Sequence, residues 1–131
     1  MGEENFAKKL AEEGKVFCSG EVRILETVPW TSHDTFTDVE MKAVVTAAQT
    51  GGVFRYYVVH IAPDKAIGWH VHPNEWESHE VIAGAGRCLA AEEEWQYTPG
   101  VLALLPPDVA HTVQAGKEGL YLLTKFIKAK A

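Results

Sequence analysis

The sequence predicts an all-β fold, a closed antiparallel barrel of the jelly-roll type, preceded by one short helix. After residue 14 the chain consists of short runs rich in β-branched and aromatic residues, separated by Gly, Pro, Asn and Asp. No helical segment that could carry a parallel crossover lies between these runs, so the strands are expected to be antiparallel. A closed architecture also removes exposed sheet edges, which favours a jelly roll or a similar barrel.

The predicted helix covers residues 5–13. Phe6 and Leu10 lie four residues apart and therefore share one helix face. Asn5 is a favourable N-cap residue, and Gly14 is a favourable stop at the C-terminal end. The N-terminal segment is thus expected to form one short amphipathic helix.

The β-like runs and the turn-forming residues between them place the remaining elements. Strands are predicted at 22–25, 39–47, 54–62, 69–71, 78–83, 87–90, 95–97, 101–105, 112–114 and 120–127. Turns are predicted at 49–52, 63–65, 73–74, 84–86, 99–100, 106–108 and 116–119. We expect residues 1–20 to form the helix and a lead-in strand, and residues 21–131 to form a single barrel domain.

Length and composition limit the class of protein. The chain has 131 residues, 47% of them hydrophobic, which is the composition of one ordinary globular domain. Its formal net charge of -6 opposes the basic surface expected of a protein that binds nucleic acid or an anionic membrane. We therefore expect neither partner.

The sequence carries no pattern typical of a membrane span or a secretory signal. The longest apolar run, Val101 to Leu105, is far shorter than a transmembrane helix needs. The chain begins with acidic residues and no apolar segment follows them, so a cytoplasmic protein is expected. Cys18 and Cys88 lack the spacing of a zinc site, and we expect both to be buried or unreactive thiols.

The pair His70 and His72 is the first sign of a functional site. Two residues apart on a strand, both side chains would point to one face and could converge on one metal ion. Glu77 opens the next β-like stretch and could return to that face, and His111 follows a predicted turn downstream. Such nitrogen and oxygen ligands suit one divalent transition metal ion, Fe, Mn, Ni, Zn or Co, better than Mg or Ca.

Two other carboxylates compete with Glu77 for this role. Glu75 stands too close to His72, and Glu80 has the opposite strand parity to Glu77. Glu77 is therefore preferred.

The spacing around His70 resembles the first motif of the cupin superfamily, Gly-x5-His-x-His-x3,4-Glu-x6-Gly. The chain offers His70 and His72, then Glu77, then Gly84 at the expected distance. Asp64 stands where the family has its first glycine, so the loop that approaches His70 departs from the pattern.

A second segment is similar to the other cupin motif, Gly-x5-Pro-x-Gly-x2-His-x3-Asn. Gly100, Pro106 and His111 match it, while Asp108 replaces a glycine and Ala115 replaces the asparagine. Aspartate is among the better non-glycine residues in a left-handed turn, so Asp108 is expected to preserve the backbone.

The resemblance covers roughly residues 54–127 and implies a cupin-like double-stranded β-helix. It also implies that His70, His72, Glu77 and His111 are metal ligands. Small cupins are usually homodimers, and outward-facing Trp69 and Trp76 would suit such a contact.

His79 and Val81 lie two and four residues after Glu77 on a predicted strand, so their side chains should point to the same interior face as Glu77. His79 is therefore a candidate catalytic acid or base or a partner of a metal ligand, although a structural histidine bonded to backbone is the alternative. Lys42 is expected to be solvated, or else to bind a substrate carboxylate.

Two histidines and two tyrosines remain to be placed. We interpret His33 and His60 as structural histidines. Tyr56 and Tyr57 alternate in direction, so only one of them can reach the pocket.

Two classes of function fit these residues. The first is a mononuclear metalloenzyme that acts on a small organic molecule with a carboxylate or carbonyl group, by dioxygenase or by isomerase or lyase chemistry. The second is a non-catalytic cupin that binds or senses a small ligand beside a structural metal. Fold alone does not decide between them.

Overall fold

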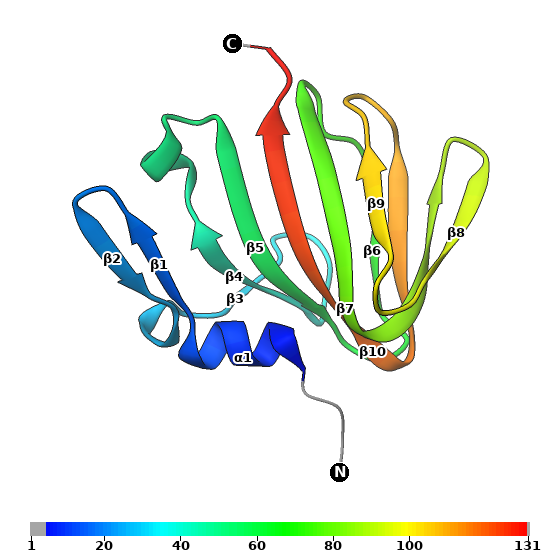
Figure 1. The fold of residues 1–131 in the computed structure, drawn as a ribbon. Coiled ribbons are helices and arrows are strands. Elements are labelled where there is room, and N and C mark those ends of the chain that lie inside the picture. Colours follow the sequence, from blue (N-terminus) through cyan, green and yellow to red (C-terminus); the bar gives the residue numbers. More distant parts are fainter. Residues whose placement is uncertain (1–4, 131) are drawn as a thin grey trace.

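A computed structural model of the protein describes residues 5–130 and has the predicted jelly-roll fold (Figure 1). Its elements are α1 (Phe6–Glu13), β1 (Lys15–Cys18), β2 (Glu21–Ile24), the 3-10 helix η1 (Leu25–Thr27), β3 (Thr31–Ser32), β4 (Val39–Val45), the 3-10 helix η2 (Ala47–Thr50), β5 (Phe54–Ile61), β6 (Ala66–His70), β7 (Glu75–Ala90), β8 (Glu93–Tyr97), β9 (Leu102–Leu105) and β10 (His111–Lys128). Within these residues no helix is long and apolar enough to cross a membrane.

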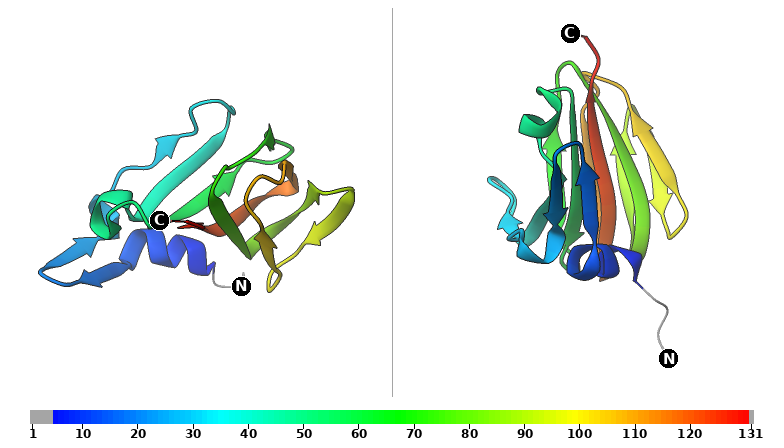
Figure 2. Two further views of the ribbon diagram at one scale, coloured as in Figure 1. Left: turned by 90° about the horizontal axis from the view of Figure 1, so that it is seen from above. Right: turned by 60° about the vertical axis from the view of Figure 1, so that its left-hand side comes forward.

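Antiparallel pairing joins most strands into one strongly curved sheet. Its order is β3-β4-β5-β10-β7-β8, with β6 added to β10 and β9 added to β7, while β1 and β2 form a separate hairpin. The view from above in Figure 2 shows how the sheet folds over itself into two layers. The strands β7 and β10 form its centre and contribute to both layers.

The turns predicted at 84–86 and 116–119 are wrong, because these segments bend the chain without reversing it. Each lies inside a single long strand, β7 or β10, and the two bends lie side by side in the antiparallel pair. Gly84 and Gly119 both have positive φ, near 80°, and a Cβ at Gly84 would collide with the carbonyl oxygen of Gly119. Glycine is needed here because two backbones approach closely at a bend.

The helix has the predicted bounds and caps. The Asn5 side chain accepts hydrogen bonds from the backbone N–H groups of Ala7 and Lys8, and the N–H of Gly14 closes the last turn on Leu10. Burial of Ala7 and Ala11 then fixes α1 against the outer face of the sheet.

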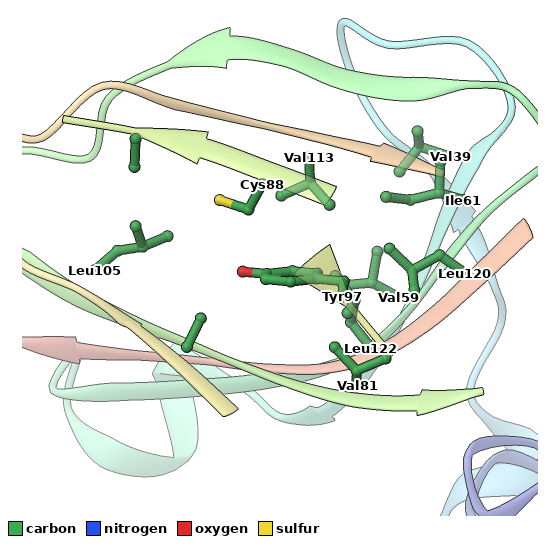
Figure 3. Close-up of a cluster of buried hydrophobic side chains, with 12 residues drawn as sticks. Val39, Val59, Ile61, Val81, Cys88, Tyr97, Leu105, Val113, Leu120 and Leu122 are labelled. Atoms are coloured by element: carbon green, nitrogen blue, oxygen red, sulfur yellow. The ribbon is translucent and has the colours of Figure 1, made fainter. Parts of the chain in front are cut away.

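Two apolar clusters pack on opposite faces of the sheet. The larger fills the barrel and includes Val59, Val81, Tyr97, Val113 and Leu122 (Figure 3). The smaller lies between α1 and the outer face and is made of Ala7, Leu25, Val44, Val58 and Leu123. The sheet therefore has a covered outer face as well as a filled interior.

Lys42 is buried in the outer cluster, and the expectation that it is solvated is wrong. Only 4% of the residue is exposed, and its ammonium group donates to the carbonyl oxygens of Ala11 at 2.9 Å and Leu25 at 2.7 Å. Its neighbour in register is Val58, a member of the outer cluster, so Lys42 faces away from the barrel interior. The lysine thereby joins the end of α1 and η1 to β4.

We expect Lys42→Met to lower the free energy of unfolding by about 2–4 kcal/mol, because two buried carbonyl groups lose a charged donor. Lys65→Met is the matched control, since within residues 5–130 the Lys65 ammonium makes only an exposed ion pair, with Asp38 at 3.6 Å. The control should stay within about 0.5 kcal/mol of the wild type. Urea denaturation of the three proteins measures both values, and equal effects of the two substitutions would contradict the bracing role of Lys42.

Candidate metal centre

Three strands bring four of the predicted site residues to one end of the barrel. His70 is the last residue of β6, His111 is the first residue of β10, and the two are paired in register. Glu77 and His79 lie on β7 and are buried, as strand parity predicts. The predicted outward direction of Trp76 on the same strand is confirmed by its 39% exposure.

The side chains of His70, Glu77 and His111 form a cluster that could hold a metal ion. One potential ligand atom of each lies within 4.8 Å of the others. His72 lies beyond the end of β6, with its Nε2 3.5 Å from Glu77 Oε1, but it is not part of this tight group of three. Three of the four predicted ligands therefore lie in one tight cluster, and the fourth, His72, lies next to it.

Backbone carbonyls orient two of the histidines. Nδ1 of His70 lies 2.7 Å from the carbonyl oxygen of Gly68, and Nδ1 of His111 lies 3.1 Å from that of Val109. A carbonyl oxygen can only accept, so Nδ1 is the donor in each ring and the neutral imidazole keeps a lone pair on Nε2. This arrangement is typical of histidines that bind metals through Nε2.

The residues fit a cation because two buried acceptor atoms face each other. Nε2 of His111 and Oε1 of Glu77 are 3.1 Å apart, yet among the described residues neither atom has a partner in a well-formed hydrogen bond. Both residues are less than 5% exposed. Two facing lone pairs in a buried site are unfavourable unless a positive charge lies between them.

The pKa values of Glu77 and His111 shift in opposite directions because the two groups interact. Burial raises the pKa of Glu77, but interactions with His111 and His79 outweigh it and hold the pKa well below its usual range. Burial lowers the pKa of His111, yet its contact with Glu77 raises that pKa overall. A proton and a metal ion are therefore alternative ways to neutralise the same buried carboxylate.

Burial also lowers the pKa values of His70 and His72. Both rings are consequently held in the neutral form that metal coordination requires.

A cavity of about 250 Å³ opens beside the cluster. His70, His72 and Glu77 form part of its wall, and Arg55, Tyr57 and Phe126 form another part. Of the two neighbouring tyrosines only Tyr57 lines it, as predicted, because Tyr56 packs in the outer cluster.

Arg55 is a cavity residue that the sequence analysis missed. Its guanidinium lies 4.4 Å from the centre of the Phe126 ring and bonds both carboxylate oxygens of Glu75, at 2.7 and 2.8 Å. Arg55 shares strand parity with Val59 and Ile61, both buried in the barrel, and this parity could have identified it.

The other histidines lie in different surroundings. Nδ1 of His33 accepts hydrogen bonds from the backbone of Thr35 and Phe36, and its side chain reaches the cavity wall. His60 stacks on Tyr121 at 4.3 Å and lines a separate pocket beside α1. Only His33 of this pair reaches the cavity beside the cluster.

Both aspartates that replace motif glycines adopt the left-handed backbone. φ is 61° at Asp64 and 68° at Asp108. The backbone N–H of Asp108 also donates to the carbonyl oxygen of His72 at 3.2 Å. The loops before His70 and His111 therefore keep the backbone course that glycine would allow.

The antiparallel jelly roll and the histidine and carboxylate cluster at one end of it define a cupin. Residues 53–124, more than half of the chain, match the model of the AraC-like ligand binding domain family. The chain belongs to this family and to the cupin superfamily, and the match supports the binding of a small molecule. No curated protein matches the sequence.

Solved structures with the same fold are distant in sequence. A predicted oxalate decarboxylase from Thermotoga maritima is 16% identical, with a TM-score of 0.71 over 79% of this chain and 95% of that one. KdgF from Halomonas is 18% identical, with a TM-score of 0.68 over 82% and 94%. A cupin-2 domain from Rhodospirillum rubrum is 16% identical, with a TM-score of 0.69 over 85% and 75%. At these identities the likeness establishes the fold alone.

Proposed function

We propose that this chain is a metal-dependent cupin enzyme that acts on a small organic acid. His70, His72, Glu77 and His111 would hold one divalent transition metal ion, Fe, Mn, Ni, Zn or Co. The facing acceptor atoms of Glu77 and His111 carry the proposal, because a cation resolves their repulsion. A bound ion would supply Lewis acidity for isomerase or lyase chemistry, or redox chemistry with dioxygen for a dioxygenase.

Arg55 supports an organic acid as the substrate class. Among the described residues it is the one arginine that lines the cavity, and its side chain is 28% exposed. Guanidinium groups match carboxylates in two-point hydrogen bonds, and stacking on Phe126 holds this one in place. The name of the Thermotoga neighbour, a predicted oxalate decarboxylase, agrees with a small carboxylate.

Glu75 neutralises Arg55 and would act as the internal competitor of a bound carboxylate. Its Oε1 bonds Arg55 and also lies 3.9 Å from Nδ1 of His72. A substrate carboxylate would therefore share the guanidinium with Glu75 or displace it.

A non-catalytic ligand-binding protein is the second candidate function. The family match favours it, because the family is described by ligand binding and not by an activity. In that case the same ion and cavity would anchor an effector without turnover.

Elemental mass spectrometry tests the metal site. Protein purified anaerobically without a histidine-rich tag should carry close to one transition metal ion per chain. Glu77→Gln and His111→Gln should each reduce this content at least about tenfold, because each removes a ligand atom from the buried cluster.

His60→Gln is the matched control, since it removes a histidine on the other face of the sheet. It should keep the metal content of the wild type. A folded wild-type protein with no metal above background, also after dialysis against Mn, Co, Ni or Zn, would refute the metal site.

Titration calorimetry with oxalate and malonate tests the acid-binding role of Arg55. Arg55→Gln should weaken binding of whichever probe binds about 10–100-fold, because a charged hydrogen bond is lost. Glu75→Gln should strengthen it, because the competing carboxylate is removed. Equal affinities in the three proteins would contradict the assignment, and binding without consumption of the probe would favour the non-catalytic candidate.

We also propose that the protein is a homodimer. The predicted exposure of Trp69 and Trp76 is confirmed, at 62% and 39%. An outer apolar patch is formed on β7, β9 and β10 by Trp76, Leu102, Leu104 and Ile127, all more than a third exposed.

The outer apolar patch suits a second copy of the chain. Lys125 and Glu80 form an ion pair of 2.6 Å with each other on the same surface. Across a two-fold axis such a surface is complementary to itself.

Multi-angle light scattering should give twice the chain mass of 14.4 kDa. Leu104→Asp should produce a monomer, because it places a charge in the outer apolar patch. Phe17→Asp is the control, since Phe17 is 79% exposed on the β1–β2 hairpin and should not affect the dimer. A monomeric wild-type protein would refute the proposal.

A further inference from the structure

A line of buried polar groups leads from the interior of the barrel to Glu77. Oε2 of Glu77 lies 2.5 Å from Nε2 of His79, and Nδ1 of His79 lies 2.8 Å from the hydroxyl of Tyr97. Tyr97 is the last residue of β8 and lies deep in the core of the barrel. Figure 3 shows Tyr97 and Cys88 within the apolar core, and both are fully buried.

The chemistry of these groups fixes the direction of each hydrogen bond. The Glu77 carboxylate can only accept, so Nε2 of His79 donates to it. The neutral imidazole then has its lone pair on Nδ1, so the Tyr97 hydroxyl donates to Nδ1. Burial raises the pKa of Tyr97, so the hydroxyl keeps the proton that it donates.

The line of donors therefore points toward Glu77 and ends on only one of its oxygens. Oε2 receives the hydrogen bond from His79, while Oε1 is directed at His111 and His72. The carboxylate is held at one oxygen and presents the other to the ligand cluster.

We propose that Tyr97 is a positioning residue that acts through His79 to fix Glu77 as a metal ligand, an inference that rests on the proposed metal site. Tyr97 sits at the end of β8, is 0% exposed and touches neither the cavity nor the cluster of His70, Glu77 and His111. It fixes the orientation of His79, whose tautomer the Glu77 carboxylate determines. Both ring nitrogens of His79, which also lines the cavity, are thereby engaged, one by Glu77 and the other by Tyr97.

Co(II) binding measured by visible absorption tests the role of Tyr97. Tyr97→Phe should weaken Co(II) binding about 10–100-fold, because loss of a partner that orients a ligand costs this much affinity. The absorption bands of the bound Co(II) should also change, since the orientation of Glu77 changes. Tyr56→Phe, which removes a tyrosine hydroxyl from the outer cluster, should keep the affinity within about twofold.

A double-mutant cycle separates this role from a general loss of packing. His79→Gln keeps an N–H donor for Glu77 but has no acceptor at the position of Nδ1. In the His79→Gln background, Tyr97→Phe should therefore cause little further loss of Co(II) affinity. A loss as large as in the wild-type background would overturn the proposal, because it would show that Tyr97 acts through packing alone.

Nitrogen-15 NMR of the wild-type protein adds a test that needs no variant. The proposal requires His79 to carry its proton on Nε2, and an Nδ1 proton would overturn it. Failure of the proposed role of Tyr97 is distinguishable from failure of the proposed metal site. A wild-type protein that binds no Co(II) refutes the site, whereas a wild-type protein that binds Co(II) as tightly as Tyr97→Phe refutes only the role of Tyr97.

Discussion

A carboxylate buried in a β-barrel is the constraint on which this structure depends. Only 4% of Glu77 is exposed, and an ionised group at such a position is costly unless charged or hydrogen-bonding partners surround it. The structure places His79 against one carboxylate oxygen and His111 against the other. His79 satisfies one oxygen, while the other faces Nε2 of His111, which lacks a hydrogen-bond partner among residues 5–130, so the site is built around a negative charge that calls for a cation.

The glycine bends of β7 and β10 bring those imidazoles to the carboxylate. Because both strands continue through their bends, residues on either side of Gly84 and Gly119 pair with one another in two layers. The first residue of β10 then reaches both β6 and the far end of β7. His70, Glu77 and His111 converge because two long strands are shared between the layers of the jelly roll.

The cluster of His70, Glu77 and His111 could be predicted from sequence because its signals are local. The spacing of the histidines and of Glu77 pointed to these residues and to His72, and strand parity placed His79 inside. The glycine segments were misinterpreted because a bend shared by two paired strands looks like a turn when each segment is considered alone.

Lys42 and Tyr97 could not be placed from sequence because their partners are distant. The outer face of β4 is covered by α1, and no pattern within β4 reveals where α1 docks. Lys42 and Arg55 illustrate the consequence: they lie on neighbouring strands, yet one faces the helix and the other faces the cavity. The two cations therefore act on opposite faces of one sheet, Lys42 in the stability of the fold and Arg55 at the site. The two oxygens of Glu77 also face different surroundings. Oε2 contacts His79 in the core, and Oε1 contacts His111 in the cluster, so a single carboxylate connects the packing of the barrel to the chemistry of its open end.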